Sequence, residues 1–259
     1  IEDNSLLRRG EECLHLKYGL DVSINAGNTL YFLPSVELFN HKYLDDIKKL
    51  RIHEIMMKTY IQAHFGQTVD IYWSKYLTPE NLKKWMNDSL EEKILQMYDY
   101  KTAAGAKGLA EVSAVIAEVN DEIKQTCIDY ARAFAVAFQI IDDIHNFSDS
   151  PRWTKVCGED LSNGKLTYVI ARAIKLLENQ KSQRLIEILC SKELRKNDDI
   201  IREGIELVRN SGAIEECKEK AKKMSLDENE RFSEIVPSCE PKIMLNMLCL
   251  KMLDLAYDT

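Results

Sequence analysis

Glycine and proline are scarce in this chain of 259 residues, which contains only 10 Gly and 5 Pro. Stretches that alternate between polar and apolar residues, the pattern typical of β-strands, are also lacking. Apolar residues make up 45% of the sequence, enough for a sizeable core, and charged residues make up 30%. This composition favours a helical protein over a sheet protein.

An excess of positive charge is missing too, because the formal net charge is −7. The charge excludes a general affinity for nucleic acid or for acidic membranes, so any anionic ligand requires local basic groups. No stretch reaches the roughly 18 consecutive apolar residues of a membrane span, and no signal peptide is visible. The 7 cysteines form no CxxC pair and no Cys/His metal spacing. They indicate reduced thiols in a cytoplasmic or similarly reducing compartment, with an upstream targeting segment as the alternative.

Capping residues mark the starts of two helices. The tripeptide at 78–80 supplies a capping hydroxyl, a proline for the first turn and an acid near the positive end of the helix. The helix that begins there is expected to continue to Val119. Asn120 begins the next helix by the same logic. The sequence contains no internal repeat, low-complexity tract or linker, so it predicts a single all-helical domain over residues 1–259.

The stretch 138–165 combines an apolar helical run with two adjacent acids, Asp142 and Asp143. Acids on a buried helix are costly unless a cation meets them. Asp142 and Asn146 share one helix face, whereas Asp143 is displaced by about 100°. Oxygen ligands favour Mg²⁺ or Ca²⁺ over zinc, and Mg²⁺ completes its shell with water and phosphate oxygens. These acids predict a metal-bridged phosphate, although most Asp-Asp pairs on helices are solvated surface.

Two further polar pairs interrupt apolar helical sequence. Gln67 and Asp70 lie three residues apart on one helix face, surrounded by aromatic and aliphatic residues, which favours an inward-facing pair. Lys101 and Thr102 precede the small residues 103–106. The lysine is either a solvated side chain or a cation directed into a cavity that the small residues leave open.

Together these motifs resemble those of the trans-isoprenyl diphosphate synthases, also called polyprenyl synthetases, especially the eukaryotic-type geranylgeranyl diphosphate synthases. FQIIDDIHN at 138–146 is similar to the second aspartate-rich motif of that family, in its DDxxN form. GEDLSNGKLTY at 158–168 is similar to the EDLxxGK segment that follows, and IEDNSLLRRG at 1–10 to the tail of the first motif. INAGN, HFGQTVDIYW and a KT pair lie between them in the family's order, so the resemblance reaches about Ile174.

The resemblance implies an all-α fold, an isoprenoid-synthase-type bundle of long antiparallel helices around a deep apolar cavity, usually in a homodimer. It implies condensation of isopentenyl diphosphate with an allylic diphosphate, most simply farnesyl diphosphate to geranylgeranyl diphosphate. Several Mg²⁺ ions would bridge the substrate diphosphate and neutralise the charge on the leaving group. The apolar cavity would keep water from the carbocation. Neither nucleic acid nor a membrane span is expected.

The resemblance also implies roles for individual residues. A diphosphate site needs lysines as point charges and arginines as forked donors. The implied metal ligands are Asp3 and Asp142, with Asp143 in support. The other implied site residues are Arg8, Arg9, Lys101, Gln139, Lys155 and Lys165 for diphosphate binding, Lys101, Thr102 and Gln139 at the reacting centre, and Gln67 and Asp70 in support.

The chain departs from the family pattern at two places that bear on function. The two leading acids of the first motif would precede Ile1, so further N-terminal helices, with residues that govern product length, are expected upstream. His145 beside the acids is unusual, and a nearby metal ion would disfavour its cationic form.

Two other functions stay open. A terpene cyclase would share the fold and the first chemical step, but its second metal motif requires a Glu where this chain, after Asn229 and Ser233, has Pro237. A non-catalytic regulatory subunit usually lacks acids of the metal motifs, whereas Asp142 and Asp143 are present. The residues encoded before Ile1 would separate the enzyme from the regulatory subunit.

Overall fold

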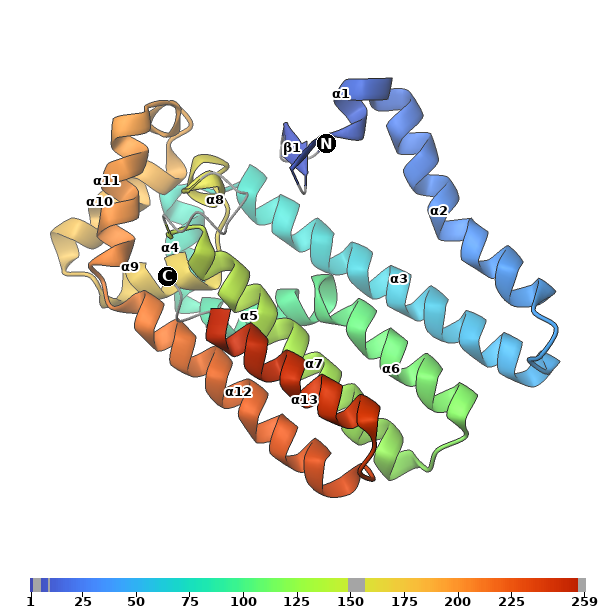
Figure 1. Ribbon diagram of the computed structural model, residues 1–259. Helices are drawn as coiled ribbons and strands as arrows, with labels where there is room; N and C mark the ends of the chain where they lie inside the picture. Colours follow the sequence, from blue (N-terminus) through green and yellow to red (C-terminus); the bar gives the residue numbers. More distant parts are fainter. Residues whose placement is uncertain (2–5, 9, 149–156, 256–259) are drawn as a thin grey trace. The chain divides into compact units, whose positions relative to one another are not determined.

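The computed structural model describes residues 1, 6–8, 10–148 and 157–255. Within them nearly every element is a helix, which confirms the predicted all-α class (Figure 1). The chain divides into two compact units, Ile1–Met57 and Lys58–Thr259, with the boundary inside helix α3 (Asp46–Lys75). No helix in the described ranges combines the length and apolarity needed to cross a lipid bilayer.

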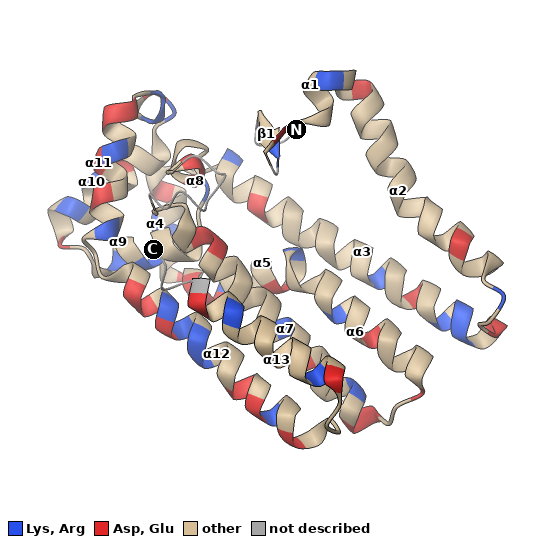
Figure 2. Cartoon of the chain, in the orientation of Figure 1, with Lys and Arg blue, Asp and Glu red and all other residues tan. Residues whose placement is uncertain are grey.

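The first unit contains the short strands that the sequence pattern did not predict. Strands β1 (Leu7–Arg8) and β2 (Glu11–Glu12) pair antiparallel, and Gly10 makes the turn between them with φ +78°. Helix α1 (Leu14–Tyr18) and helix α2 (Leu20–Asn40) follow. Helix α2 carries few charges (Figure 2), and within this unit its large apolar side chains are exposed.

The second unit is a packed array of helices that continues from α3. Buried, mostly aliphatic side chains from several of its helices form one core around α7. The elements after α3 are α4 (Pro79–Asn87), α5 (Leu90–Lys101), α6 (Ala103–Ala117), α7 (Asp121–His145), α8 (Glu159–Ser162), α9 (Tyr168–Leu176), α10 (Asn179–Cys190), the 3₁₀ helix η1 (Leu194–Lys196), α11 (Asp198–Arg209), α12 (Ala213–Ile235) and α13 (Glu240–Leu255).

Helix α7 is the central element of this unit, and it packs against α6 on one side and α12 on another (Figure 1). Its predicted start is confirmed, because Asn120 Oδ1 accepts a hydrogen bond from the backbone N–H of Ile123 at 2.9 Å. Small residues such as Ala133 and Ala137 are buried along it and allow close helix approach. The predicted acid pair lies in the last turn of the helix, which brings the acids to the edge of the core.

The prediction of one continuous helix from 78 to 119 is wrong, because three helices, α4, α5 and α6, cover this range. Thr78 caps α4 as predicted, with Oγ1 accepting from Asn81 N–H at 3.2 Å. The chain then breaks at Ser89, which has φ 59°, and again at Thr102, between α5 and α6. The second break lies against α3, where a Cβ added to Gly66 would come within 2.3 Å of the backbone nitrogen of Lys101. Tertiary packing therefore ends α5, because no proline or glycine stands at this point.

Candidate active site

The acid pair on the last turn of α7 splits between two environments. Asp143 is buried, with 2% of its surface exposed, whereas Asp142 is half-buried. The difference follows from the helix, because adjacent residues point about 100° apart. Asp143 turns toward the core and Asp142 toward the edge.

Two donors share the buried carboxylate of Asp143. The hydroxyl of Tyr98, on α5, donates to Oδ2. Nε2 of Gln139, one turn earlier on α7, donates to Oδ1 at 3.0 Å. Burial raises the pKa of Asp143 well above its usual range, as does the nearby charge of Asp160, while both donors act in the opposite direction. Burial likewise raises the pKa of Tyr98, so its hydroxyl keeps its proton.

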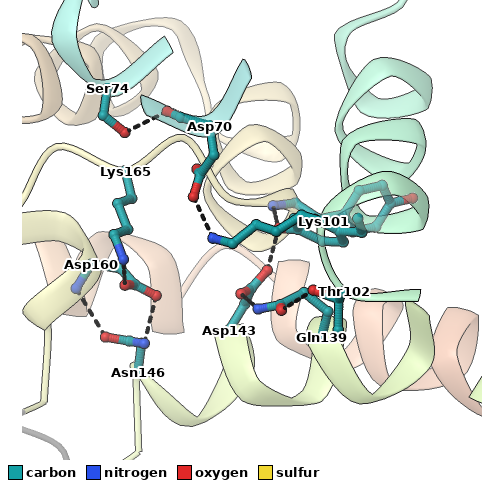
Figure 3. A network of polar contacts seen from close by, with 11 residues as sticks. Asp70, Ser74, Lys101, Thr102, Gln139, Asp143, Asn146, Asp160 and Lys165 are labelled. Carbon is teal, nitrogen blue, oxygen red and sulfur yellow. Dashed lines mark hydrogen bonds and ion pairs between the residues drawn. The ribbon is translucent and has the colours of Figure 1, made fainter. Parts of the chain in front are cut away.

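The hydrogen-bond network continues from Gln139 to the break between α5 and α6. Thr102 Oγ1 donates to Gln139 Oε1 at 2.7 Å (Figure 3). Thr102 thereby meets α7 across the interface between helices that are far apart in sequence. The predicted pair at the reacting centre, Thr102 and Gln139, is in direct contact.

Lys101 points to the other neighbour of the break, helix α3. Its ammonium pairs with Asp70 Oδ2 (Figure 3), and Asp70 is 8% exposed. The pair forms one turn beyond Gly66, where α3 lies directly against the backbone of Lys101. The expectation that Asp70 faces inward is confirmed by its burial, and Gln67 beside it is half-buried. Lys101 uses one of its three donors on Asp70 and retains capacity for an anion.

A second cluster joins the end of α7 to the segment around α8. Asn146 Nδ2 donates to Asp160 Oδ2 at 2.6 Å, and Asn146 Oδ1 accepts from the backbone N–H of Asp160 at 3.0 Å. Asp160 Oδ1 lies 3.6 Å from Lys165 Nζ (Figure 3). Both groups of the Asn146 amide are engaged in this pairing, and the residue is 2% exposed.

The structure brings together most of the predicted residues that it describes. Thr102, Gln139 and Asp143 are joined by hydrogen bonds, and Figure 3 draws the Lys101–Asp70 and Lys165–Asp160 pairs in the same view. Arg8 is exposed on β1 in the first unit. Asp3, Arg9 and Lys155 lie outside the described residues. Within the described ranges, no three His, Cys, Asp or Glu side chains are placed to hold a metal ion together.

Two residues of the network were not assigned a role from the sequence. Tyr98 stands three residues before Lys101 in an apolar run, and a buried tyrosine hydroxyl requires a polar partner. That requirement was a signal, although the partner, 45 positions later, was not visible. Asp160 lies in the quoted EDLxxGK segment, but its pairing with Asn146 depends on how the chain returns after α7.

Comparison with known proteins agrees with this geometry. The family model described as polyprenyl synthetase matches residues 1–208. The short chain isoprenyl diphosphate synthase of Methanocaldococcus jannaschii is 31% identical over 212 residues, 82% of this chain and 60% of that protein. A geranylgeranyl pyrophosphate synthase of Penicillium ochrochloron is 29% identical over 254 residues, 96% of this chain and 65% of that protein. The chain thus spans less than two thirds of the length of these relatives.

Solved structures share the fold. Geranylgeranyl pyrophosphate synthetase from Pyrococcus horikoshii superimposes with a TM-score of 0.81 at 25% identity, over 97% of this chain and 72% of that one. Geranylgeranyl pyrophosphate synthase from Corynebacterium glutamicum, solved with isoprenyl diphosphate and magnesium, gives a TM-score of 0.83 at 20% identity, with coverage of 97% and 72%. The motif order, the helical fold and the match over residues 1–208 lead to one conclusion: the chain belongs to the polyprenyl synthetase family.

Proposed function

We propose that this chain is the part of a prenyltransferase that condenses isopentenyl diphosphate with an allylic diphosphate, with farnesyl diphosphate as the allylic substrate that is extended by one C5 unit. The observation that carries the proposal is the contact between Thr102 and Gln139, fixed by Asp143, at a break where the preceding residue, Lys101, pairs with Asp70. This arrangement puts polar oxygens and a cation at one edge of an apolar helical core. The product would be geranylgeranyl diphosphate.

The proposed anion site uses the lysines that partner acids hold in place. Lys101 is oriented by Asp70, and Lys165 by Asp160, and their side chains remain 28% and 20% exposed. A half-buried ammonium binds diphosphate as a point charge, with less water to compete than at the surface. Arg8, Arg9 and Lys155 are proposed as further diphosphate ligands on the family resemblance alone.

Asp142 is the residue proposed to hold Mg²⁺ in this part of the chain. The donor set fits, because Asp142 is a half-buried carboxylate at a helix end, and Mg²⁺ requires only one or two carboxylates besides water and phosphate oxygens. Asp143 supports it from the buried side, and Asp3 is the proposed ligand from the first motif. When bound, the metal supplies Lewis-acid neutralisation of the diphosphate leaving group.

The remaining residues bind, orient and exclude water. Thr102 and Gln139 would line the reacting centre with oxygen dipoles directed at the positive charge that develops on the allylic carbon. Isopentenyl diphosphate then forms the new C–C bond, and the proton lost from it passes to the released diphosphate. The apolar helices around the site would keep out the water that could quench the cation.

A homodimer and a cytoplasmic location form part of the proposal. The exposed apolar side chains of α2 support burial against a second copy, because monomers rarely leave such a surface open. The seven cysteines all lie in the described residues and none forms a disulfide, which supports a reducing compartment. A terpene cyclase gains no support, since Ser233 Oγ accepts from Asn246 Nδ2 at 3.2 Å and ties α12 to α13.

The test is an assay of the full-length protein with isopentenyl and farnesyl diphosphates, with Mg²⁺ and with excess chelator. We expect a C20 diphosphate in the presence of Mg²⁺ and none with the chelator. Shorter allylic diphosphates in parallel reactions would reveal a different product length. The absence of any elongated product from every allylic substrate would overturn the proposal, and a cyclised hydrocarbon would identify the cyclase instead.

A further inference from the structure

Tyr98 connects three helices through a single buried hydroxyl. It belongs to α5 and is 3% exposed. Its oxygen accepts a hydrogen bond from the backbone N–H of Tyr168, the first residue of α9, at 2.9 Å, and its O–H donates a hydrogen bond to Asp143 on α7. We propose that Tyr98 is a positioning residue for the reaction at this site, acting through Asp143 and Gln139 on Thr102. This inference rests on the proposed prenyl transfer.

The first step of the argument is the anchoring of the tyrosine hydroxyl. The start of α9 is itself capped, because Thr167 Oγ1 accepts from Ile170 N–H at 3.3 Å. The Tyr168 N–H is therefore held in place and occupies a lone pair of the tyrosine oxygen. The tyrosine O–H is therefore directed at Asp143. Asp143 is so deeply buried that water cannot take the place of the tyrosine as its donor.

The second step is the orientation of the Gln139 amide. With Tyr98 on Oδ2 of Asp143, the other oxygen, Oδ1, accepts from Gln139 Nε2 at 3.0 Å. The amide nitrogen of Gln139 thus faces Asp143, and its amide oxygen faces Thr102. Without the tyrosine, Asp143 loses one of its two donors and is free to rotate, and the amide loses the partner that selects its orientation.

The third step concerns the hydroxyl of Thr102. Because the amide oxygen of Gln139 faces it, Thr102 donates its one proton at 2.7 Å and presents only lone pairs to its other neighbours. Such an oxygen stabilises positive charge and cannot donate to an anion. The direction of this hydroxyl thus depends on Tyr98, two hydrogen-bonded residues away.

The simpler alternative is that Tyr98 only satisfies its own buried hydroxyl and contributes stability alone. Tyr130 is a matched control, because it is also buried, at 6% exposed, and donates to a backbone carbonyl, that of Leu245, at 2.9 Å. Its hydrogen bond joins α7 to α13 and has no contact with the network. Removal of either hydroxyl leaves the ring in place and one acceptor without its donor, and removal of the Tyr98 hydroxyl also leaves the Tyr168 N–H without its acceptor.

The experiment compares Tyr98→Phe and Tyr130→Phe in the full-length protein. We expect a larger decrease in melting temperature for Tyr98→Phe, which leaves two polar groups unpaired, than for Tyr130→Phe, which leaves one. For Tyr98→Phe we also expect a decrease of about tenfold in kcat and a KM for the allylic diphosphate within about twofold of wild type. Tyr130→Phe should keep the wild-type kcat. Equal kcat values for the two variants would overturn the proposal.

The route through Gln139 is tested by combining variants. In a Gln139→Ala background, Tyr98→Phe should lower kcat by less than about twofold further, because the route is already cut. A full multiplicative loss would show that Tyr98 acts by another path and would overturn this inference.

A structural readout separates this inference from the proposed function. In a crystal structure of Tyr98→Phe, we expect the Gln139 amide to turn and the contact with Thr102 to be lost, whereas Tyr130→Phe keeps it. If the wild-type protein has no prenyltransferase activity, the proposed function fails, and this measurement still decides the role of Tyr98. A Thr102–Gln139 bond retained at its 2.7 Å length in Tyr98→Phe would refute it.

Discussion

Asn146 and Asp160 hold each other by two hydrogen bonds, from the Asn146 amide nitrogen to Asp160 Oδ2 at 2.6 Å and from the Asp160 backbone N–H to Asn146 Oδ1 at 3.0 Å. The pair joins the end of α7 to the start of α8 across the segment 149–156. Because Asp160 also lies 3.6 Å from the Lys165 ammonium, the pair fixes the position of a proposed diphosphate ligand. The amide of Asn146 suits this position, because its nitrogen donates to the Asp160 side chain while its oxygen accepts from the Asp160 N–H.

Asn146→Asp is expected to destabilise the protein by about 2 kcal/mol, because a buried carboxylate would then face the half-buried carboxylate of Asp160. Restoring one amide in the double variant Asn146→Asp/Asp160→Asn should recover much of this loss. Urea unfolding of the wild type, both single variants and the double variant measures the coupling. Strict additivity of the two changes would contradict the described pairing.

Asp142→Ala should lower turnover by more than about a hundredfold while changing stability by less than about 1 kcal/mol. The reason is that Asp142 is half-buried and its charge opposes ionisation of the neighbouring Asp143, so its removal relieves repulsion in the fold. Asp254→Ala, an exposed acid on α13, is the control and should leave turnover unchanged. Turnover is measured as product per unit time at saturating substrate, and stability by urea unfolding. Loss of folding in Asp142→Ala would assign the residue a structural role.

Gly66→Ala should destabilise the protein by about 1 to 3 kcal/mol, through overpacking. An ideal Cβ at this position lies 2.3 Å from Lys101 N and 2.7 Å from Lys101 Cα, both backbone atoms that cannot move without shifting a helix. Gly105→Ala is the matched control, because its Cβ meets nothing within 4 Å and the change should stabilise α6 by about 0.5 to 1 kcal/mol. Thermal unfolding compares the two, and a stabilising Gly66→Ala would show that α3 lies further from the break.

Glu91→Gln should remove stability that depends on pH. Burial opposes ionisation of Glu91, but hydrogen bonds from Lys175 at 2.9 Å and Arg172 at 3.2 Å outweigh it and lower the pKa. The folded state therefore binds fewer protons than the unfolded chain below the ordinary carboxyl pKa of 4.5. The contribution, about 1 kcal/mol, is fully present above that pH and is lost as pH falls through the lowered pKa.

The measurement is the free energy of unfolding of wild type and Glu91→Gln at pH values from 7 down to about 3. The difference between them should be constant near neutrality and shrink in acid. Glu92→Gln, at the adjacent exposed position, should show little difference at any pH. A gap between wild type and Glu91→Gln that widens as pH falls would contradict the lowered pKa.

The sequence was sufficient for the features that depend on local chemistry. Thr78 and Asn120 cap the helices predicted from them, and the apolar run before the acid pair is helix α7. The break at Thr102 was not predictable in this way, because it comes from the packing of Gly66 on the chain and not from a helix-breaking residue. The strand pair at Leu7–Arg8 is too short to leave a pattern.

The candidate site likewise contains residues that the sequence indicated and contacts that it did not. The family motifs identified Lys101, Thr102 and Gln139, whose contacts the structure describes. The pairing of Tyr98 with Asp143 joins positions 45 apart, and no periodicity in the sequence specifies which buried hydroxyl meets which carboxylate. The pairing of Asn146 with Asp160 was likewise not visible in the sequence, because it depends on how the chain returns after α7.

The break between α5 and α6 also limits how the length of this chain can vary. Lys101 and Thr102 are adjacent in sequence, yet their side chains contact different helices. Lys101 contacts Asp70 on α3, and Thr102 contacts Gln139 on α7. One inserted or deleted residue in α5 near its end would rotate the downstream residues by about 100° and take either side chain from its partner. The turn at Ser89, with φ 59°, lies about three helical turns away and could absorb such a change. Insertions in related chains are therefore expected near Ser89 and excluded at Lys101–Thr102.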